Sequence, residues 1–383
     1  MTKMSKKDLI SAVKPRYLKA RRKEKTKILV EFCQNTGYNR KYAITIMAAG
    51  YNHRKVEKTG RKKRKPKYGN EVICTAVKVW ELLDFPCGVR LKPSLEPTIE
   101  AMERHKEITV TTKVRRGLLE ISARTLDRRL KKEREVRRLD RHRGTTKHGS
   151  LLKSQIPIRI TNWDTSEVGF MEMDTVSHNG GDPNGQFVSS LDMVEIYSGW
   201  SEQYAIMGKG ETETVRAVDD IRADLPVEIS GLDSDSGSEF VNWHMVRYCQ
   251  KEPTLYFTRS RPDKKNDNAY VEQKNGSHIR DLLGFGRFDT PTHVKTMNDL
   301  YRNELRLMNN FFKPVMKIKS KEKINNSVCR KKYDIAKTPY QRLMGCPDIP
   351  DKKKKELQVL YLSLNPVQLK KQIDAKVKII KNL

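Results

Sequence analysis

The chain has 383 residues, enough for two or three domains that each bury a core of their own. Its formal net charge of +30 favours nucleic acid as a partner over an anionic membrane surface. No apolar run approaches the roughly 18 residues needed to span a bilayer, and the lysine-rich start lacks the apolar segment of a signal peptide. We therefore expect an intracellular protein without membrane contact. Its six cysteines are scattered, with no C-x-x-C pair, and should be reduced thiols.

The charge is distributed unevenly along the chain. Residues 1–155 carry a net charge of +26, residues 156–290 carry −10, and residues 291–383 carry +14. One interpretation is that the basic flanks hold a polyanion while the acidic middle concentrates carboxylates that hold cations. The alternative is an ordinary soluble domain with surface acids in the middle.

Residues 24–49 have the pattern of two short helices joined by a polar turn. Apolar residues recur on each side of an Asn-Thr-Gly turn at positions 35–37, namely Ile28, Leu29, Phe32, Tyr42, Ile46 and Met47. This spacing is typical of a helix-turn-helix unit. Arg40 and Lys41 open the second helix, where contacts with DNA are usually made, so we expect both to bind DNA.

A second such unit is predicted at residues 110–134. Leu118, Leu119 and Ile121 form the apolar end of one helix, and Ser122 is the expected N-cap of the next. Arg124, Arg128 and Arg129 would form a basic, DNA-binding side of that helix, while Leu126 and Leu130 face the other way. For both units the alternative is a helical bundle with solvated charges. Between the two units, residues 61–70 contain six Lys/Arg and Pro66. This segment is either a solvated linker or a contact with DNA phosphates.

From residue 168 the apolar periodicity changes to that of strands. Strands are predicted at 168–176, 186–196 and 201–208, the first two joined by a Gly/Asn/Asp-rich hairpin connection. A helix (211–225), a strand (227–237), a helix (238–250), a strand (254–260) and a helix (268–284) follow. This order, three strands and then alternating helices and strands, is that of the ribonuclease-H-like α/β fold.

Three acidic residues occupy suggestive positions in these elements. Asp174 lies within the first strand, Asp235 ends the fourth, and Glu272 opens the last helix, 37 positions after Asp235. Carboxylates from separate elements must converge to hold two divalent cations about 4 Å apart. A carboxylate in the middle of a strand must also be paired or bind metal if it is buried. Two neighbours stay open as alternative or supporting ligands, Asp233 and Glu172, because each lies two positions from a candidate and so on the same face of its strand.

The blocks "FMEMDTVSH", "LDSDSGSEFVN" and "SRPDKKNDNAYVEQKN" resemble the integrase-type catalytic core of DDE transposases, in which two Asp and one Glu bind the metals. The resemblance covers residues 168–285. It extends less specifically to the upstream helix-turn-helix region and to residues 330–344, which resemble the stretch after the core in transposases of bacterial insertion sequences. One departure is Ser236, where the family usually has Asn, so a secondary hydrogen bond is in doubt while the metal ligand is kept.

The resemblance implies a DDE polynucleotidyl transferase that cuts and joins the terminal inverted repeats of an insertion sequence. Asp174, Asp235 and Glu272 would be the catalytic and metal-binding residues, holding two Mg²⁺ (or Mn²⁺) ions. Lys274, two residues after Glu272, would contact DNA. Such an enzyme would be cytoplasmic and nucleoid-associated, and a homo-oligomer, at least a dimer on transposon-end and target DNA.

The predicted organisation is multidomain. It comprises an all-α helix-turn-helix region (1–60), a second helical region and linker (61–150), a ribonuclease-H-like catalytic core (160–290) and a basic C-terminal region (291–383). His178, in the hairpin connection, is either a loop residue or part of the active site. Two rival functions remain: a metal-dependent nuclease of the same fold without strand transfer, and a non-enzymatic DNA-binding regulator derived from a transposase.

Overall fold

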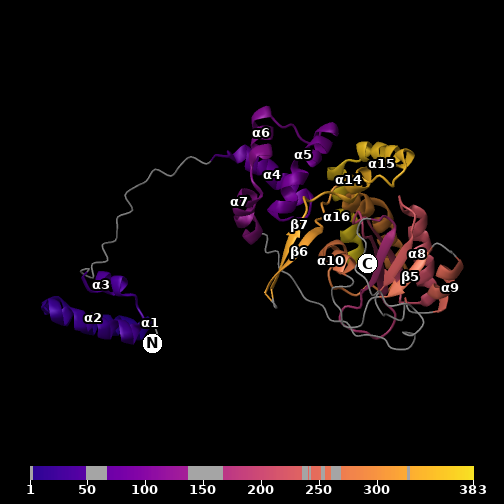
Figure 1. Cartoon of the computed structure of the whole chain (residues 1–383). Coiled ribbons are helices and arrows are strands. Elements are labelled where there is room, and N and C mark those ends of the chain that lie inside the picture. The colour runs from indigo at the N-terminus through magenta and orange to yellow at the C-terminus, as the bar shows by residue number, and fades with distance from the viewer. Residues whose placement is uncertain are drawn as a thin grey trace. The chain divides into compact units, whose positions relative to one another are not determined.

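The computed structural model describes residues 3–48, 67–136, 167–234, 240, 243–251, 255–259, 269–325 and 328–383. The chain forms two compact units, residues 1–67 and residues 68–383, which Figure 1 draws in one colour scale. In the described part of the chain, no helix is long and apolar enough to cross a membrane. Asp235 lies outside the described residues, as does most of the 61–70 basic run.

The first unit consists of α1 (Lys3–Lys19), α2 (Arg22–Thr36) and α3 (Arg40–Ala48). The two predicted helices are thus present, and the turn between them begins at Gly37, whose φ of 70° ends α2. The predicted Ile28, Leu29 and Phe32 are buried, but Tyr42 is 53% exposed, so its expected place on the apolar side was wrong. The predicted Met47 is buried, and Ala43, four positions before it, takes the place expected of Tyr42 on the buried side of α3.

The second unit begins with four helices: α4 (Asn70–Leu82), α5 (Gly88–Arg104), α6 (Thr112–Glu120) and α7 (Ala123–Val136). The predicted N-cap is confirmed, because Ser122 Oγ accepts a hydrogen bond from the Thr125 amide at 3.2 Å. Leu126 and Leu130 are buried as expected, whereas Leu119 is 55% exposed, against the prediction. Leu118 and Ile121 face the core, and Leu119 falls on the other side of the helix.

A five-stranded sheet forms the centre of this unit. Its strands are β1 (Phe170–Ser177), β2 (Val188–Glu195), β3 (Ser201–Met207), β4 (Gly231–Ser234) and β5 (Tyr256–Arg259). They lie in the order β3-β2-β1-β4-β5. β1, β2 and β3 are antiparallel, and β4 and β5 run parallel to β1 and β4, respectively.

The connecting helices complete the predicted order of elements. α8 (Glu211–Asp224) lies between β3 and β4, and α9 (Trp243–Lys251) between β4 and β5. After β5 come α10 (Ala269–Lys274), a π-helical turn η1 (Asn275–Arg280) and α11 (Asp281–Leu283). The sequence-based order is therefore confirmed, and the core is a mixed α/β sheet.

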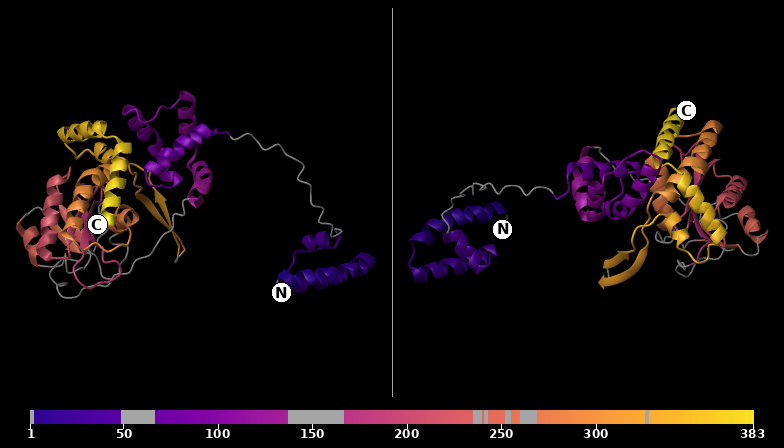
Figure 2. Two further views of the ribbon diagram at one scale, coloured as in Figure 1. Left: turned by 180° about the vertical axis from the view of Figure 1, so that it is seen from behind. Right: turned by 90° about the horizontal axis from the view of Figure 1, so that it is seen from above.

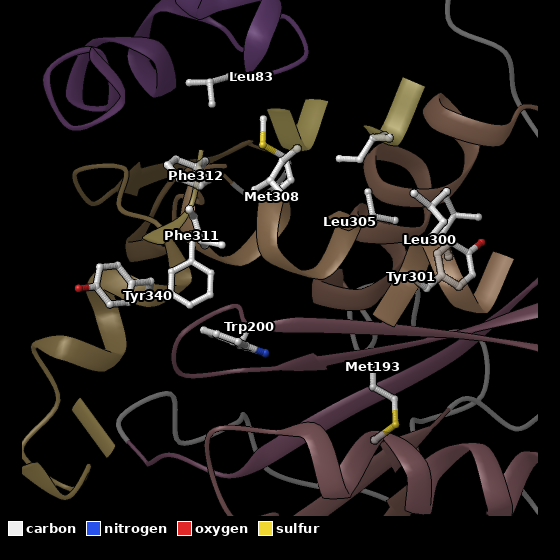
Figure 3. Close-up of a cluster of buried hydrophobic side chains, with 14 of the residues drawn as sticks. Leu83, Met193, Trp200, Leu300, Tyr301, Leu305, Met308, Phe311, Phe312 and Tyr340 are labelled. Carbon is white, nitrogen blue, oxygen red and sulfur yellow. The ribbon is translucent and has the colours of Figure 1, made fainter. Parts of the chain in front are cut away.

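The C-terminal region packs on this core. It contains α12 (Pro291–Leu300), η2 (Tyr301–Leu305), α13 (Arg306–Phe311), a separate hairpin of β6 (Ile318–Asn325) and β7 (Val328–Tyr333), α14 (Pro339–Met344), α15 (Asp351–Ser363) and α16 (Pro366–Asn382). α16 buries Leu369, Ile373 and Ile380 in the hydrophobic core that α4, α5 and the sheet also share. In this region the ring of Phe311 packs against both Tyr340 and Trp200, as Figure 3 shows.

Two asparagines cover the free edge of β3. Asn310 accepts a hydrogen bond from the Ser201 amide and donates one to the Ser201 carbonyl, both at 2.9 Å. Asn298 forms the same pair of bonds with Ala205, at 2.6 and 2.8 Å. An unpaired strand edge is a template for pairing with another chain, and these side chains occupy it.

We expect Asn310→Ala to lower the free energy of unfolding by about 2–4 kcal/mol, because it leaves the buried amide and carbonyl of Ser201 without partners. Urea denaturation measures this change. The matched control is Asn303→Ala on the exposed side of η2, which should change stability by less than about 0.5 kcal/mol. Equal effects of the two substitutions would show that the edge contacts contribute nothing.

Candidate carboxylate site

Four acidic side chains share one face of the sheet. Glu172 and Asp174 are two apart on β1, and the strand register places Asp192 opposite Asp174 and Asp233 opposite Glu172. Glu172, Asp192 and Asp233 are completely buried, and Asp174 is half-buried. Buried carboxylates are stable only when they are hydrogen-bonded, paired or metal-bound, so the partners of each one define its role.

Asp174 is held by the helix that follows β5. Asn275 Nδ2 donates a hydrogen bond to Asp174 Oδ2 at 2.7 Å, and the Thr175 amide donates to Oδ1 at 2.7 Å. Each carboxylate oxygen has two lone pairs, so these two hydrogen bonds are compatible with a role as a metal ligand. Asn275 was not among the residues predicted for the site, although its position three residues after Glu272 places the two on neighbouring positions of one helix surface.

Glu272 lies in the first turn of α10 and is exposed. Residues three apart in a helix are neighbours on its surface, so Glu272 is on the side of the helix from which Asn275 reaches Asp174. The fold thus brings the helix that carries the third predicted carboxylate against the strand that carries the first.

Glu172 and Asp233, the open alternatives, both serve the protein's own structure. Glu172 Oε2 accepts hydrogen bonds from the amides of Tyr270 and Val271, at 3.0 and 3.1 Å, and so caps the N-terminus of α10. Asp233 Oδ1 accepts a hydrogen bond from the hydroxyl of Thr258 on β5. Glu172 and Asp233 therefore stabilise the start of α10 and the pairing with β5, whereas Asp174 contacts the helix that carries Glu272.

The donor set suits a hard divalent cation. Carboxylate oxygens are the ligands that Mg²⁺ prefers, and Asp174 and Glu272 supply them from two different elements. Among the described residues alone, no group of three or more His, Cys, Asp or Glu side chains could hold a metal ion. The second predicted ligand, Asp235, comes directly after Ser234, the last residue of β4, and lies outside the described residues.

Lys274 points into the protein. Its side chain is only 7% exposed, and its Nζ lies 3.4 Å from His278 Nε2. Burial lowers the pKa of Lys274 to about 7, and burial raises the pKa of Asp192, on the neighbouring strand, to about 7. Lys274 was predicted to contact DNA. Such a contact would therefore require this side chain to leave its buried position.

The other predicted DNA-binding residues lie on helix surfaces. Arg40 and Lys41, at the start of α3, are exposed. Arg124 and Arg128 are exposed on α7, four positions apart, and Arg129 is half-buried. Their positions leave them accessible to a ligand, and their contact with DNA remains a prediction.

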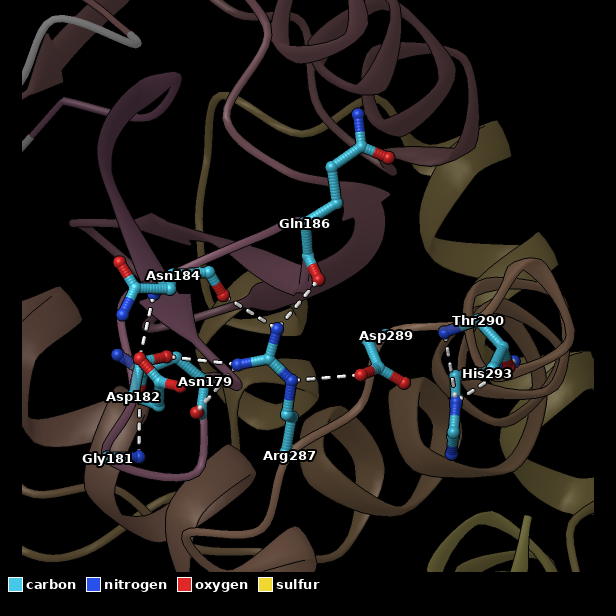
Figure 4. Close-up of polar contacts among 9 residues, drawn as sticks. All are labelled: Asn179, Gly181, Asp182, Asn184, Gln186, Arg287, Asp289, Thr290 and His293. Atoms are coloured by element: carbon cyan, nitrogen blue, oxygen red, sulfur yellow. Dashed lines mark hydrogen bonds and ion pairs between the residues drawn. The ribbon is translucent and has the colours of Figure 1, made fainter.

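The hairpin connection between β1 and β2 is fixed by Arg287, as Figure 4 shows. The guanidinium of Arg287 donates hydrogen bonds to four carbonyl oxygens of this connection, at 2.8–3.3 Å, those of Asn179, Asp182, Asn184 and Gln186. His178, at the start of the connection, is fully buried, with Nε2 2.8 Å from Ser190 Oγ. Burial lowers the pKa of His178 to about 3, so it is neutral near pH 7 and acts as a packing residue in this structure.

No family model matches this chain. The uncharacterized protein y4rM of Sinorhizobium fredii (strain NBRC 101917 / NGR234) is 34% identical over 341 residues, which are 89% of this chain and 95% of the relative.

Similar solved structures include retroviral integrases. The HTLV-2 integrase catalytic core domain in complex with magnesium, in its dimeric form, is 15% identical with a TM-score of 0.28, and the match covers 38% of this chain and 89% of that one. A simian T-cell lymphotropic virus intasome in complex with a PP2A regulatory subunit is 13% identical with a TM-score of 0.34, covering 65% and 76%. These TM-scores are too low to assign a fold, which rests on the strand order of the sheet itself.

Proposed function

This chain belongs to the same family as the uncharacterized protein y4rM of Sinorhizobium fredii, and we propose that it is an insertion-sequence transposase of the DDE type. The proposed reaction is metal-dependent cleavage at the ends of the element, followed by transfer of the freed 3′-hydroxyl to target DNA. The observation that carries the proposal is the contact of Asn275 with Asp174, which brings the helix of Glu272 against β1.

In this proposal Asp174, Asp235 and Glu272 bind two Mg²⁺ or Mn²⁺ ions. Bound there, the ions would supply activation of the attacking oxygen and stabilisation of the leaving one. The chain's own residues arrange the ligands: Asn275 orients the carboxylate of Asp174, and Glu172 fixes the start of the helix that carries Glu272.

DNA binding is assigned to the basic flanks. The exposed cations on α3 and α7, Arg40, Lys41, Arg124 and Arg128, together with Arg129, would contact the terminal inverted repeats. The net charges of +26 and +14 on either side of the acidic middle support a long polyanionic partner. Joining two ends of one element requires at least two active sites, so we propose a homo-oligomer, at least a dimer, on DNA.

Strand transfer distinguishes this function from its rivals. We expect the purified full chain, with Mg²⁺, to join a pre-cut duplex bearing the terminal sequence that flanks the gene to a supercoiled plasmid. The products are measured as labelled, nicked or linear plasmid on a gel. Cleavage of the duplex without joined products would indicate a nuclease, and end binding without cleavage or joining would indicate a DNA-binding regulator.

A further inference from the structure

The strands β6 and β7 form a two-stranded sheet of their own, separate from the central sheet. The right-hand view of Figure 2 shows this ribbon projecting from the body of the second unit. Neither the order of elements in the catalytic core nor the proposed helix-turn-helix contacts require such a projection.

The ribbon is strongly basic. Residues 318–333 contain six Lys/Arg and one acidic residue, Glu322. Lys319, Arg330, Lys331 and Lys332 are exposed. Among the described residues, Lys332 forms an ion pair with Glu322 on the facing strand, and the other three form none. The ribbon therefore presents an excess of positive charge to its surroundings.

This arrangement is unfavourable for a ribbon with no partner. A two-stranded hairpin is at best marginally stable in water. The described cations of the ribbon, Lys319, Arg330, Lys331 and Lys332, outnumber its one carboxylate, Glu322, and like charges held close together repel. A bound polyanion would offset both costs.

The base of the ribbon, by contrast, is firmly attached. Asp334 accepts a hydrogen bond from the Lys317 amide at 2.7 Å and forms an ion pair with Arg342 on α14 at 2.8 Å. Arg342 also donates to the carbonyl of Val315 at 3.0 Å, and Val315 bridges to Lys337 on the returning chain. The ribbon is thus held at its base by the folded core while its strands extend away.

We propose that the β6–β7 ribbon is a DNA-binding arm that follows the phosphate backbone of a duplex, an inference that rests on the proposed function. Strand residues rise about 3.3 Å each, and each DNA strand carries one phosphate per about 3.4 Å of helix axis. Because successive side chains point to opposite faces of a strand, the cations on one face of an extended, basic ribbon recur about every 6.6 Å and can lie beside every second phosphate. Such contacts add affinity without reading sequence.

The test compares two triple variants of the full chain with equal loss of charge. One carries Lys319→Gln, Arg330→Gln and Lys331→Gln in the ribbon. The control carries Lys352→Gln, Lys354→Gln and Lys355→Gln on α15, a lysine cluster in the same unit. Fluorescence anisotropy with a random-sequence duplex, repeated over a range of salt concentrations, gives the affinity and its salt dependence.

We expect the ribbon variant to reduce the slope of log K against log salt by about 2 to 3, because each phosphate contact contributes about 0.9. The control variant should change the slope by less than about 1. Backbone amides of β6 and β7 should also gain protection from hydrogen exchange when the duplex binds to the unaltered chain.

Equal slopes for the ribbon variant and the unaltered chain, or equal losses in the two variants, would overturn the inference. The inference would also be overturned if the ribbon variant bound anionic lipid vesicles or RNA more weakly than the unaltered chain but bound duplex DNA equally well. Strand transfer is measured on the same preparations. If the unaltered chain joins ends and the ribbon variant keeps its DNA affinity, the inference about the ribbon is wrong and the proposed function is supported. If the unaltered chain neither cleaves nor joins, the proposed function fails, and the salt slopes still decide whether the ribbon binds DNA.

Discussion

Replacing Asp174 by asparagine is expected to lower cleavage and strand transfer by about 10³-fold or more while leaving DNA-end binding unchanged. Loss of a metal-binding carboxylate removes several kcal/mol of transition-state stabilisation. The substitution changes the charge but not the shape of the side chain. Asparagine has one acceptor oxygen where the carboxylate has two, so it can keep the hydrogen bond from Asn275 while it loses the one from the Thr175 amide, and the fold should be retained.

The measurement is a single-turnover cleavage assay together with gel-shift binding of the same end. Asp281→Asn is the matched control, since Asp281 is an exposed carboxylate at the start of α11, and its rate should stay within about twofold of the unaltered chain. Cleavage by the Asp174→Asn variant at an unchanged rate would exclude Asp174 as a metal ligand. Loss of binding and cleavage together would point instead to misfolding.

The central sheet was predictable because its strands carry an unambiguous pattern. Alternation in β1 and the Gly/Asn/Asp-rich connection to β2 identify a hairpin without any knowledge of tertiary structure. The position of Asp174 in that strand followed directly. The choice between Glu172 and Asp174 could not be made in the same way, because residues two apart share a face of the strand. What distinguishes them is their hydrogen-bond partners, which are distant in sequence: Asn275 contacts Asp174, and the start of α10 contacts Glu172.

Burial of polar residues was the least predictable feature. Lys274 lies two residues after Glu272, and its sequence context predicts an exposed cation. In the structure, however, it is buried and contacts His278. Periodicity likewise located α3 and α6 but not which side of each would be covered, so Tyr42 and Leu119 were misplaced. In each case the deciding contact comes from an element distant in sequence or from the packing of a neighbouring helix.

The C-terminal region illustrates the same limit on a larger scale. Its lysine-rich composition indicates a basic surface but says nothing about which residues pack inward. Leu369, Ile373 and Ile380 on α16 enter the core shared with α4 and α5, more than 200 residues earlier in the chain. In the structure, residues 68–383 form one compact unit. Its division into helical, catalytic and C-terminal domains at the predicted boundaries remains a prediction.

Substitutions of Glu172 should separate a helix cap from a metal ligand. Glu172→Ala is expected to lower the free energy of unfolding by about 2–5 kcal/mol, because the buried amides of Tyr270 and Val271 lose their acceptor and a cavity is left. Glu172→Gln keeps an acceptor oxygen and loses only the charge that favours the helix N-terminus, so its cost should be about 1 kcal/mol. Urea denaturation measures both values.

The same glutamine variant gives the decisive kinetic comparison. If Glu172 only positions α10, Glu172→Gln should keep most of the cleavage rate and require no more than a few-fold higher Mg²⁺ concentration, since Asp174 and Glu272 still supply their oxygens. If Glu172 is itself a ligand, the variant should lose cleavage as completely as Asp174→Asn while unfolding at nearly the normal urea concentration. The capping contacts at 3.0 and 3.1 Å favour the first outcome, because they direct Oε2 of Glu172 to the backbone at the start of α10.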